Sequence, residues 1–163
     1  MDIDRTAAFY GLLQVAYADM TEHLATYLYL LRRRAEPKLE FRCVYKLMFR
    51  QMLNQFKDEL KEFDTGKPVS PEVHELRNAC KKMSGLADWR NDRIHARVRV
   101  VADGYALYDW LTGLRLSMTA EELERKIEEV NYINASLEAY MLTLLGDLAR
   151  ADNIGALLEA TLD

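Results

Sequence analysis

Three residues that could do chemistry together, Arg90, Asn91 and His95, lie within six positions of one another. Arginine carries planar donors that stay charged and fit a phosphate, and histidine can take or give a proton near neutral pH. On a helix, Asn91 and His95 would be neighbours, so the amide could hold the imidazole in one orientation. This set would suffice to cleave RNA without a metal. His95 would take the proton of a ribose 2′-hydroxyl, and Arg90 would stabilise the charge that builds up on the phosphate.

The spacing between Arg90 and His95 sets a geometric condition on this mechanism. Five residues along a straight helix turn the two side chains roughly 140° apart. They converge only if the helix distorts near Ile94, or if a second copy of the chain brings its own arginine across a two-fold axis, so we expect a homodimer. In the structural alternative, Arg90 pairs with an acid of a neighbouring helix and His95 caps the helix that carries it.

The pattern Arg90-Asn91-x3-His95, late in a helix of an all-α chain of this size, resembles the signature of the HEPN superfamily (higher eukaryotes and prokaryotes nucleotide-binding). That signature is an arginine, a polar residue directly after it, and a histidine five to seven positions beyond the arginine. Many members have a glycine after the histidine, where this chain has Ala96.

The resemblance implies a bundle of four to five helices and a dimer in which both motifs face a shared cleft. It also implies a metal-independent endoribonuclease, often a toxin or a defence effector with an antitoxin or another partner protein. Other members of the superfamily are non-catalytic helical partners or nucleotide-binding sensors, and both remain alternatives for this chain.

The composition favours one folded domain over residues 1–163, of which half are hydrophobic. No stretch approaches the roughly 18 consecutive apolar residues of a membrane span. The acidic N-terminus lacks the basic region of a secretory signal. Cys43 and Cys80 are too isolated for a disulfide framework or a zinc site. We therefore expect a cytoplasmic protein with no metal, no cofactor and no membrane partner.

The net charge is −4, but basic residues gather around the motif. Between residues 77 and 99, seven lysines and arginines stand against two acids. Such a segment favours RNA as a partner, and a solvated basic helix is the alternative explanation. The predicted RNA-binding residues are Arg93, Arg97, Arg99, Tyr108 and Trp110.

Apolar residues at steps of three and four predict the helices that position the motif. The first covers residues 4–34, and the second begins with Pro37 in its first turn and ends near Asp64. A third helix, which carries the motif, begins after Ser70 as its N-cap, with Pro71 as its first residue.

The last long helix begins with a capping-box pattern at residues 119–122. Its apolar seam is interrupted by Asn134, which we interpret as a residue that fixes the packing register. A further short helix is predicted near residues 154–162.

β-Branched residues and an Asp-Gly pair after the third helix predict a β-hairpin over about residues 97–111. A turn centred on residues 103–104 pairs Arg99 with Tyr108 and Arg97 with Trp110. One face would pack on the bundle, and the other would lay arginines against aromatic rings that could stack on bases. The predicted fold is therefore an all-α bundle of four to five helices with a β-hairpin inserted after the third helix.

Overall fold

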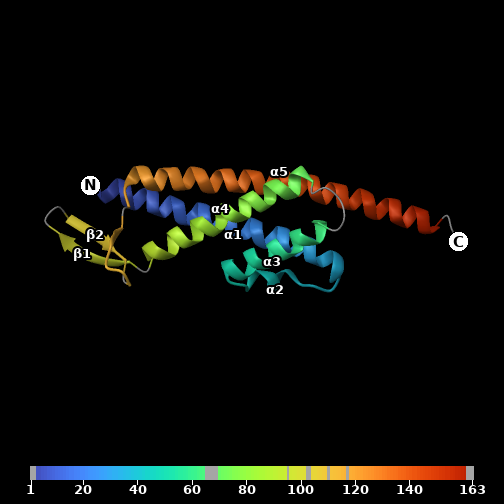
Figure 1. Cartoon of the computed structure of the whole chain (residues 1–163), viewed down its shortest axis with the longest axis horizontal. Helices are drawn as coiled ribbons and strands as arrows, with labels where there is room; N and C mark the ends of the chain where they lie inside the picture. The colour runs from blue at the N-terminus through green and yellow to red at the C-terminus, as the bar shows by residue number, and fades with distance from the viewer. Residues whose placement is uncertain are drawn as a thin grey trace.

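The computed structural model (Figure 1) describes residues 3–64, 70–94, 96–101, 104–109, 111–116 and 118–160, without the side chains at 3, 4, 64, 94, 98–101, 104, 105 and 152–160. Its elements in chain order are α1 (Ile3–Ala35), α2 (Phe41–Tyr45), α3 (Phe49–Lys61), a 3-10 turn (Glu62–Asp64), α4 (Pro71–Ile94), β1 (Arg97–Val101), β2 (Gly104–Tyr108), β3 (Arg115–Leu116) and α5 (Ala120–Ala160). The predicted fold class, a helical bundle with a small β unit before the last helix, is confirmed.

The three long helices α1, α4 and α5 meet at one end of the bundle (Figure 1). Arg5, near the start of α1, lies 3.8 Å from Glu121 at the start of α5, so these two helices run in parallel. Helix α4 runs the opposite way and brings Trp89, near its own end, to Glu122. The segment with the candidate motif therefore lies where three helix ends gather.

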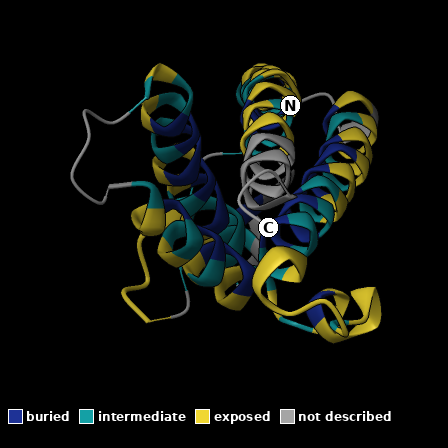
Figure 2. Ribbon diagram, turned by 90° about the vertical axis from the view of Figure 1, so that its right-hand side faces the viewer, coloured by how far each residue is buried: buried dark blue, intermediate teal, exposed yellow. Residues whose placement is uncertain are grey.

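The core lies between α1, α3, α4 and α5, and buried residues face the middle of the bundle in Figure 2. Its largest fully buried side chains are Phe56, Leu13, Met20, Leu24, Leu28, Met52, Leu60, Leu76, Met83, Leu86, Leu123 and Ile133. Spacings of three and four residues within each helix put these side chains on one face, as the periodicity predicted.

The predicted second helix is wrong in its first half. Pro37 lies in a turn, and two separate helices, α2 and α3, replace the continuous one. Between them the backbone of Met48 is extended, and its N–H donates to Gln51 Oε1 at 2.9 Å, which caps a new helix start. The break lets Phe49 pack on Tyr17, with ring centroids 5.1 Å apart.

Both predicted N-caps are confirmed. Ser70 Oγ accepts the N–H of Val73 at 3.3 Å, and Thr119 Oγ1 accepts the N–H of Glu122 at 3.2 Å. The separate helix predicted near residues 154–162 is wrong, because α5 continues without a break to Ala160. The stretch contains no proline, and an isolated glycine does not end a helix.

The predicted hairpin exists, but its register is wrong. Arg97 lies opposite Tyr108 and Arg99 opposite Ala106, where the prediction paired Arg99 with Tyr108 and Arg97 with Trp110. Val101 opposite Gly104 is the last pair before the loop, which is therefore centred one residue earlier than expected.

A turn at Asp109 explains why β2 ends at Tyr108. The carboxylate of Asp109 accepts the N–H groups of Leu111 and Thr112 at 3.0 and 2.6 Å, and this turn leads into β3. The third strand, which was not predicted, places Arg115 opposite Tyr108. Trp110 lies outside the described residues.

Gly85 offers a test of the helix that carries the motif. It is exposed in the middle of α4, and an added Cβ would meet nothing within 4 Å. Because glycine costs about 1 kcal/mol relative to alanine inside a helix, Gly85→Ala should raise the free energy of unfolding by about that amount in urea titrations. Gly113→Ala is the control and should destabilise, since Gly113 has φ +69°. If Gly85→Ala leaves the free energy of unfolding unchanged or lowers it, an exposed position of Gly85 inside α4 is contradicted.

Candidate functional site

Arg90 points from α4 towards α1. Its Nε and Nη2 donate to Gln14 Oε1 at 3.3 and 3.2 Å, and its guanidinium carbon lies 4.6 Å from the centroid of the Tyr17 ring. The structural alternative expected an acid as partner, but no carboxylate of the described residues forms an ion pair with Arg90. The positive charge of Arg90 thus lies against a neutral amide and an aromatic face.

A pocket of about 400 Å³ opens beside this arginine. Its lining comes from α1, from the end of α2, from the start of α3 and from α4, namely Gln14, Tyr17, Ala18, Thr21, Glu22, Tyr45, Phe49 and Arg90. Tyr45 is 58 % exposed, so one aromatic ring is open to solvent at the edge of the pocket. A cation and aromatic rings therefore line the same hollow.

Gln14 adds an unused donor to the pocket. Its Nε2 is buried and has no hydrogen-bond partner among the described residues. The orientation of the amide is fixed, because a guanidinium only donates and must face the oxygen. A buried donor without a partner costs about 1–3 kcal/mol. A ligand oxygen in the pocket can approach Arg90 directly, and it can satisfy the covered Nε2 after a shift of the Gln14 side chain.

The hydroxyl of Tyr17 stays protonated in this surrounding. Burial raises the pKa of Tyr17 to about 12, although the positive charges of Arg90 and Arg50 act in the opposite direction. Arg50 itself pairs with Asp88 on α4. At neutral pH the part of the pocket around Arg90 therefore carries the guanidinium, an amide donor and a neutral phenol, a set that favours an anionic ligand or one rich in acceptors. The lining also includes the exposed acid Glu22, which favours placing a ligand's negative charge at Arg90.

The raised pKa of Tyr17 predicts a loss of stability in alkali. The unfolded chain releases this proton near pH 10 and the folded chain near pH 12. The stabilisation is therefore complete below pH 10 and is lost between pH 10 and 12, by on the order of 2 kcal/mol. Urea titrations at pH 9 and 11 should show a larger loss in the wild type than in Tyr17→Phe. Equal losses in the two proteins would contradict this prediction.

Arg93, predicted to bind RNA, lies in a nearly buried network between α4 and α5. Its Nη2 is 2.9 Å from Glu122 Oε1, and these side chains are only 11 % and 18 % exposed. Its guanidinium carbon lies 4.1 Å from the centroid of the Trp89 ring, and Trp89 Nε1 donates to the same Glu122 oxygen at 3.0 Å. The donors named here are therefore directed at protein groups.

The other predicted site residues are distributed around the end of α4. Asn91 is half-buried on α4, one position after Arg90. Arg97 is exposed in β1, opposite the half-buried Tyr108. Arg99 lies in β1 opposite Ala106, and its side chain is not described. His95 lies outside the described residues, as does Trp110, so the predicted meeting of imidazole and guanidinium stays a prediction.

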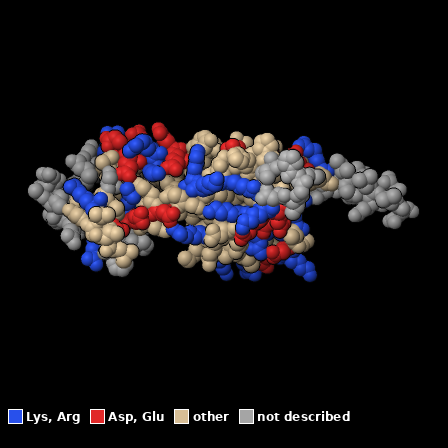
Figure 3. Space-filling view, in the orientation of Figure 1, with Lys and Arg blue, Asp and Glu red and all other residues tan. Residues whose placement is uncertain are grey.

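The basic segment predicted from the sequence continues along α4 beyond this site. Lys81 and Lys82 are exposed, and Figure 3 shows cationic side chains gathered across the middle of the face on which α4 lies. Lys82 Nζ lies 4.0 Å from the centroid of the Tyr132 ring, and Tyr132 is itself 56 % exposed. This surface is separate from the Arg90 pocket.

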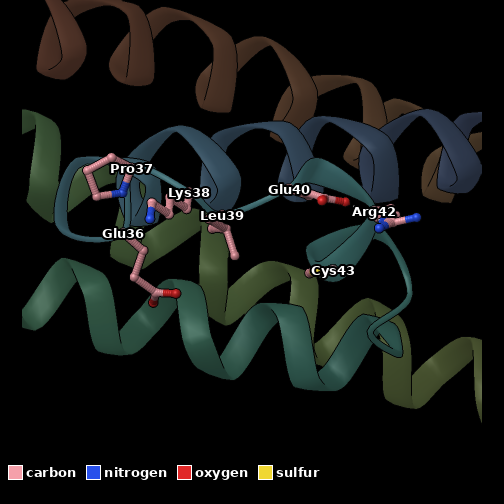
Figure 4. Close-up of a pocket in the computed structure, with 7 residues that line it drawn as sticks. All are labelled: Glu36, Pro37, Lys38, Leu39, Glu40, Arg42 and Cys43. Carbon is pink, nitrogen blue, oxygen red and sulfur yellow. Dashed lines mark ion pairs between the residues drawn. The ribbon is translucent and has the colours of Figure 1, made fainter.

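A second pocket, of about 580 Å³, lies at the connection between α1 and α2 (Figure 4). Its side chains spread along the connection and do not converge on one point. Of its charged residues, Arg42 pairs with Glu40. No buried donor without a partner is found in this lining, so the Arg90 pocket is the stronger candidate site.

Sequence reasoning missed the residues that surround Arg90 in space. Tyr17 belongs to the apolar stripe of the first helix, and Gln14 follows Leu13 of the same stripe. A polar side chain beside an apolar stripe was the one signal for Gln14. Nothing in the sequence indicated that Tyr45 lies near either of them.

Within the described parts of the chain, no three His, Cys, Asp or Glu side chains gather as a metal site would require. None of the helices searched there has the length and apolar character to cross a membrane. Comparisons with family models, with curated proteins and with solved structures find no match to this chain. The assignment of function therefore rests on the motif and on the geometry of the Arg90 pocket.

Proposed function

We propose that the protein is a homodimeric, metal-independent endoribonuclease of the HEPN type, in which the Arg90 pocket holds a phosphate of the RNA strand. The observation that carries this proposal is that the Arg90 guanidinium, which forms no ion pair with a carboxylate of the described residues, lines the same pocket as Gln14, whose Nε2 has no hydrogen-bond partner among them. Both groups are donors, and a non-bridging phosphate oxygen can accept from both.

The chain's own residues supply each step of the proposed reaction. His95 takes the proton of the ribose 2′-hydroxyl, and Asn91 holds its imidazole in place. The 2′-oxygen forms a bond to the adjacent phosphorus, and the bond from phosphorus to the 5′-oxygen breaks. Arg90 stabilises the extra negative charge in between. The products are a 2′,3′-cyclic phosphate and a 5′-hydroxyl, whose proton comes from water or from an imidazolium.

Aromatic rings and the hairpin complete the proposed RNA contacts. A base can stack on the exposed ring of Tyr45 while its phosphate lies at Arg90. Arg97 and Arg99 of β1, with Tyr108 and Trp110, stay the predicted contacts to the neighbouring nucleotides. A role as a toxin or defence effector, with an antitoxin or another partner protein, belongs to the same proposal.

The direct test is cleavage of RNA in EDTA by the wild type and by His95→Ala. The wild type should yield 2′,3′-cyclic phosphate ends, and His95→Ala should be slower by about 100-fold or more. His74→Ala, a change of an exposed histidine in the first turn of α4, is the matched control and should keep most of the activity. Equal rates in wild type and His95→Ala, or no cleavage of structured and unstructured RNAs by the wild type, would contradict the proposal.

A nucleotide-binding sensor is the second candidate, favoured by the size of the pocket. About 400 Å³ lies within the usual range for a small-molecule site. Calorimetry with mononucleotides should then show saturable binding that Arg90→Ala removes, without cleavage of RNA. If both binding and cleavage are absent, a non-catalytic helical interaction module remains.

A further inference from the structure

Helix α1 carries exposed apolar residues in addition to those that it buries in the core. One side is buried in the core, and the other carries a stripe of exposed residues at alternating steps of three and four: Arg5, Ala8, Leu12, Val15, Asp19 and Glu22. The side chains of Leu12 and Val15 at its centre are 56 % and 61 % exposed. The stripe therefore has an apolar centre between charged ends, and this centre is uncovered in the single chain.

The charges along this stripe specify what could cover it. Arg5 lies at one end, where it also contacts the acids Glu121 and Glu124 of α5, and Asp19 and Glu22 lie at the other end. A second α1 packed in parallel would set like charges side by side. A second α1 turned round by a two-fold axis between Leu12 and Val15 would set opposite charges together.

We propose that the outer stripe of α1 is the interface between two copies of this chain, packed antiparallel. Leu12 then faces the partner's Val15, and Arg5 faces the partner's Glu22, with the partner's Asp19 beside it. Alternating steps of three and four are the spacing of helix pairs that pack along a seam. The stripe spans about 25 Å at 1.5 Å per residue, and each contact occurs twice across the axis.

The proposed interface borders the Arg90 pocket. Gln14, Ala18 and Glu22 of α1 line that pocket. Tyr45, which also lines the pocket, and Met48, next to the lining residue Phe49 in the chain, are 58 % and 69 % exposed and add apolar surface for a second copy. A partner on this stripe would therefore lie at the mouth of the pocket. The inference deepens the homodimer of the proposed function, but it does not depend on RNA cleavage.

Charge reversal tests both the surface and its direction. Arg5→Glu and the double variant Asp19→Lys/Glu22→Lys should each weaken dimerisation more than tenfold in sedimentation equilibrium. An equimolar mixture of the two should form a heterodimer, because every facing pair across the axis is then opposite in charge again. Lys81→Glu, on α4, is the matched control and should dimerise as the wild type does.

The folding of each variant is checked by circular dichroism and thermal unfolding. Arg5 also lies 3.8 Å from Glu121 and from Glu124, but all three side chains are about half exposed or more, so losing these pairs costs little. A monomeric wild type, variants that dimerise normally, or a mixture that stays monomeric would each overturn the inference. If the heterodimer is restored but RNA is not cleaved, the interface is supported and the proposed endoribonuclease activity is contradicted. If a monomeric wild type cleaves RNA, the activity is supported and the interface is contradicted.

Discussion

Arg90→Ala should cleave RNA about 100- to 1,000-fold more slowly than the wild type, because the donor that stabilises the phosphorane is lost. Arg90→Lys should not restore the rate. A single ammonium group cannot lie over the Tyr17 ring and at the same time donate through two nitrogens to Gln14, as the guanidinium does. Single-turnover rates with one defined RNA measure both effects.

The variant Gln14→Glu tests whether cleavage depends on the positive charge of Arg90 or only on where its side chain lies. The new carboxylate would hold the guanidinium in place but would neutralise it, and it would remove the free donor at Nε2. We therefore expect slow cleavage with a folded protein whose thermal stability is maintained. Full activity in Arg90→Ala would show that the pocket does not hold the reacting phosphate.

Glu122→Ala should lower the free energy of unfolding by about 3–5 kcal/mol, since it leaves the nearly buried guanidinium of Arg93 without its acid. It also removes the acceptor of Trp89 Nε1. Urea titration at neutral pH measures the loss. Glu121→Ala is the matched control, because the side chain of Glu121 is 69 % exposed, and it should change stability by less than about 1 kcal/mol.

A small effect of Glu122→Ala would mean that Arg93 does not depend on this acid. That result would favour the predicted role of Arg93 in binding RNA over a role in joining α4 to α5. The measurement therefore decides between a role in joining α4 to α5 and a role in holding RNA. Loss of stability with unchanged RNA binding by the folded fraction would support the first.

Strong local signals made most of the helices predictable. The stripe of α1 repeats over the whole helix, and Ser70 and Thr119 are side chains that cap helix starts in almost any context. The hairpin was visible from its β-branched residues and its Asp-Gly pair.

Boundaries set by tertiary contacts were not predictable. The break before Phe49 has no proline or glycine, and the ring contact of Phe49 with Tyr17 on another helix accompanies it. In the hairpin, the turn at Asp109 follows the last residue of β2 and leads into β3. In both places a distant or later segment overrides a local preference.

The candidate site, too, was predictable from the sequence only in part. The motif on α4 could be read from residue types and spacing alone. Its surroundings could not, because Gln14 and Arg90 are 76 residues apart and meet only through helix packing. Arg93 belongs to the same basic segment as Arg90, and only the packing of α5 directs it to Glu122 instead of solvent.

The network around Trp89 provides an optical reporter beside the site. Its indole stacks with Arg93 and donates to Glu122, and it is adjacent in the chain to Arg90. The chain has two tryptophans, so Trp110→Phe leaves a single emitter at this position. The emission maximum and quantum yield of that variant would follow nucleotide titrations without a label. The same spectrum would also report when α4 separates from α5 during unfolding.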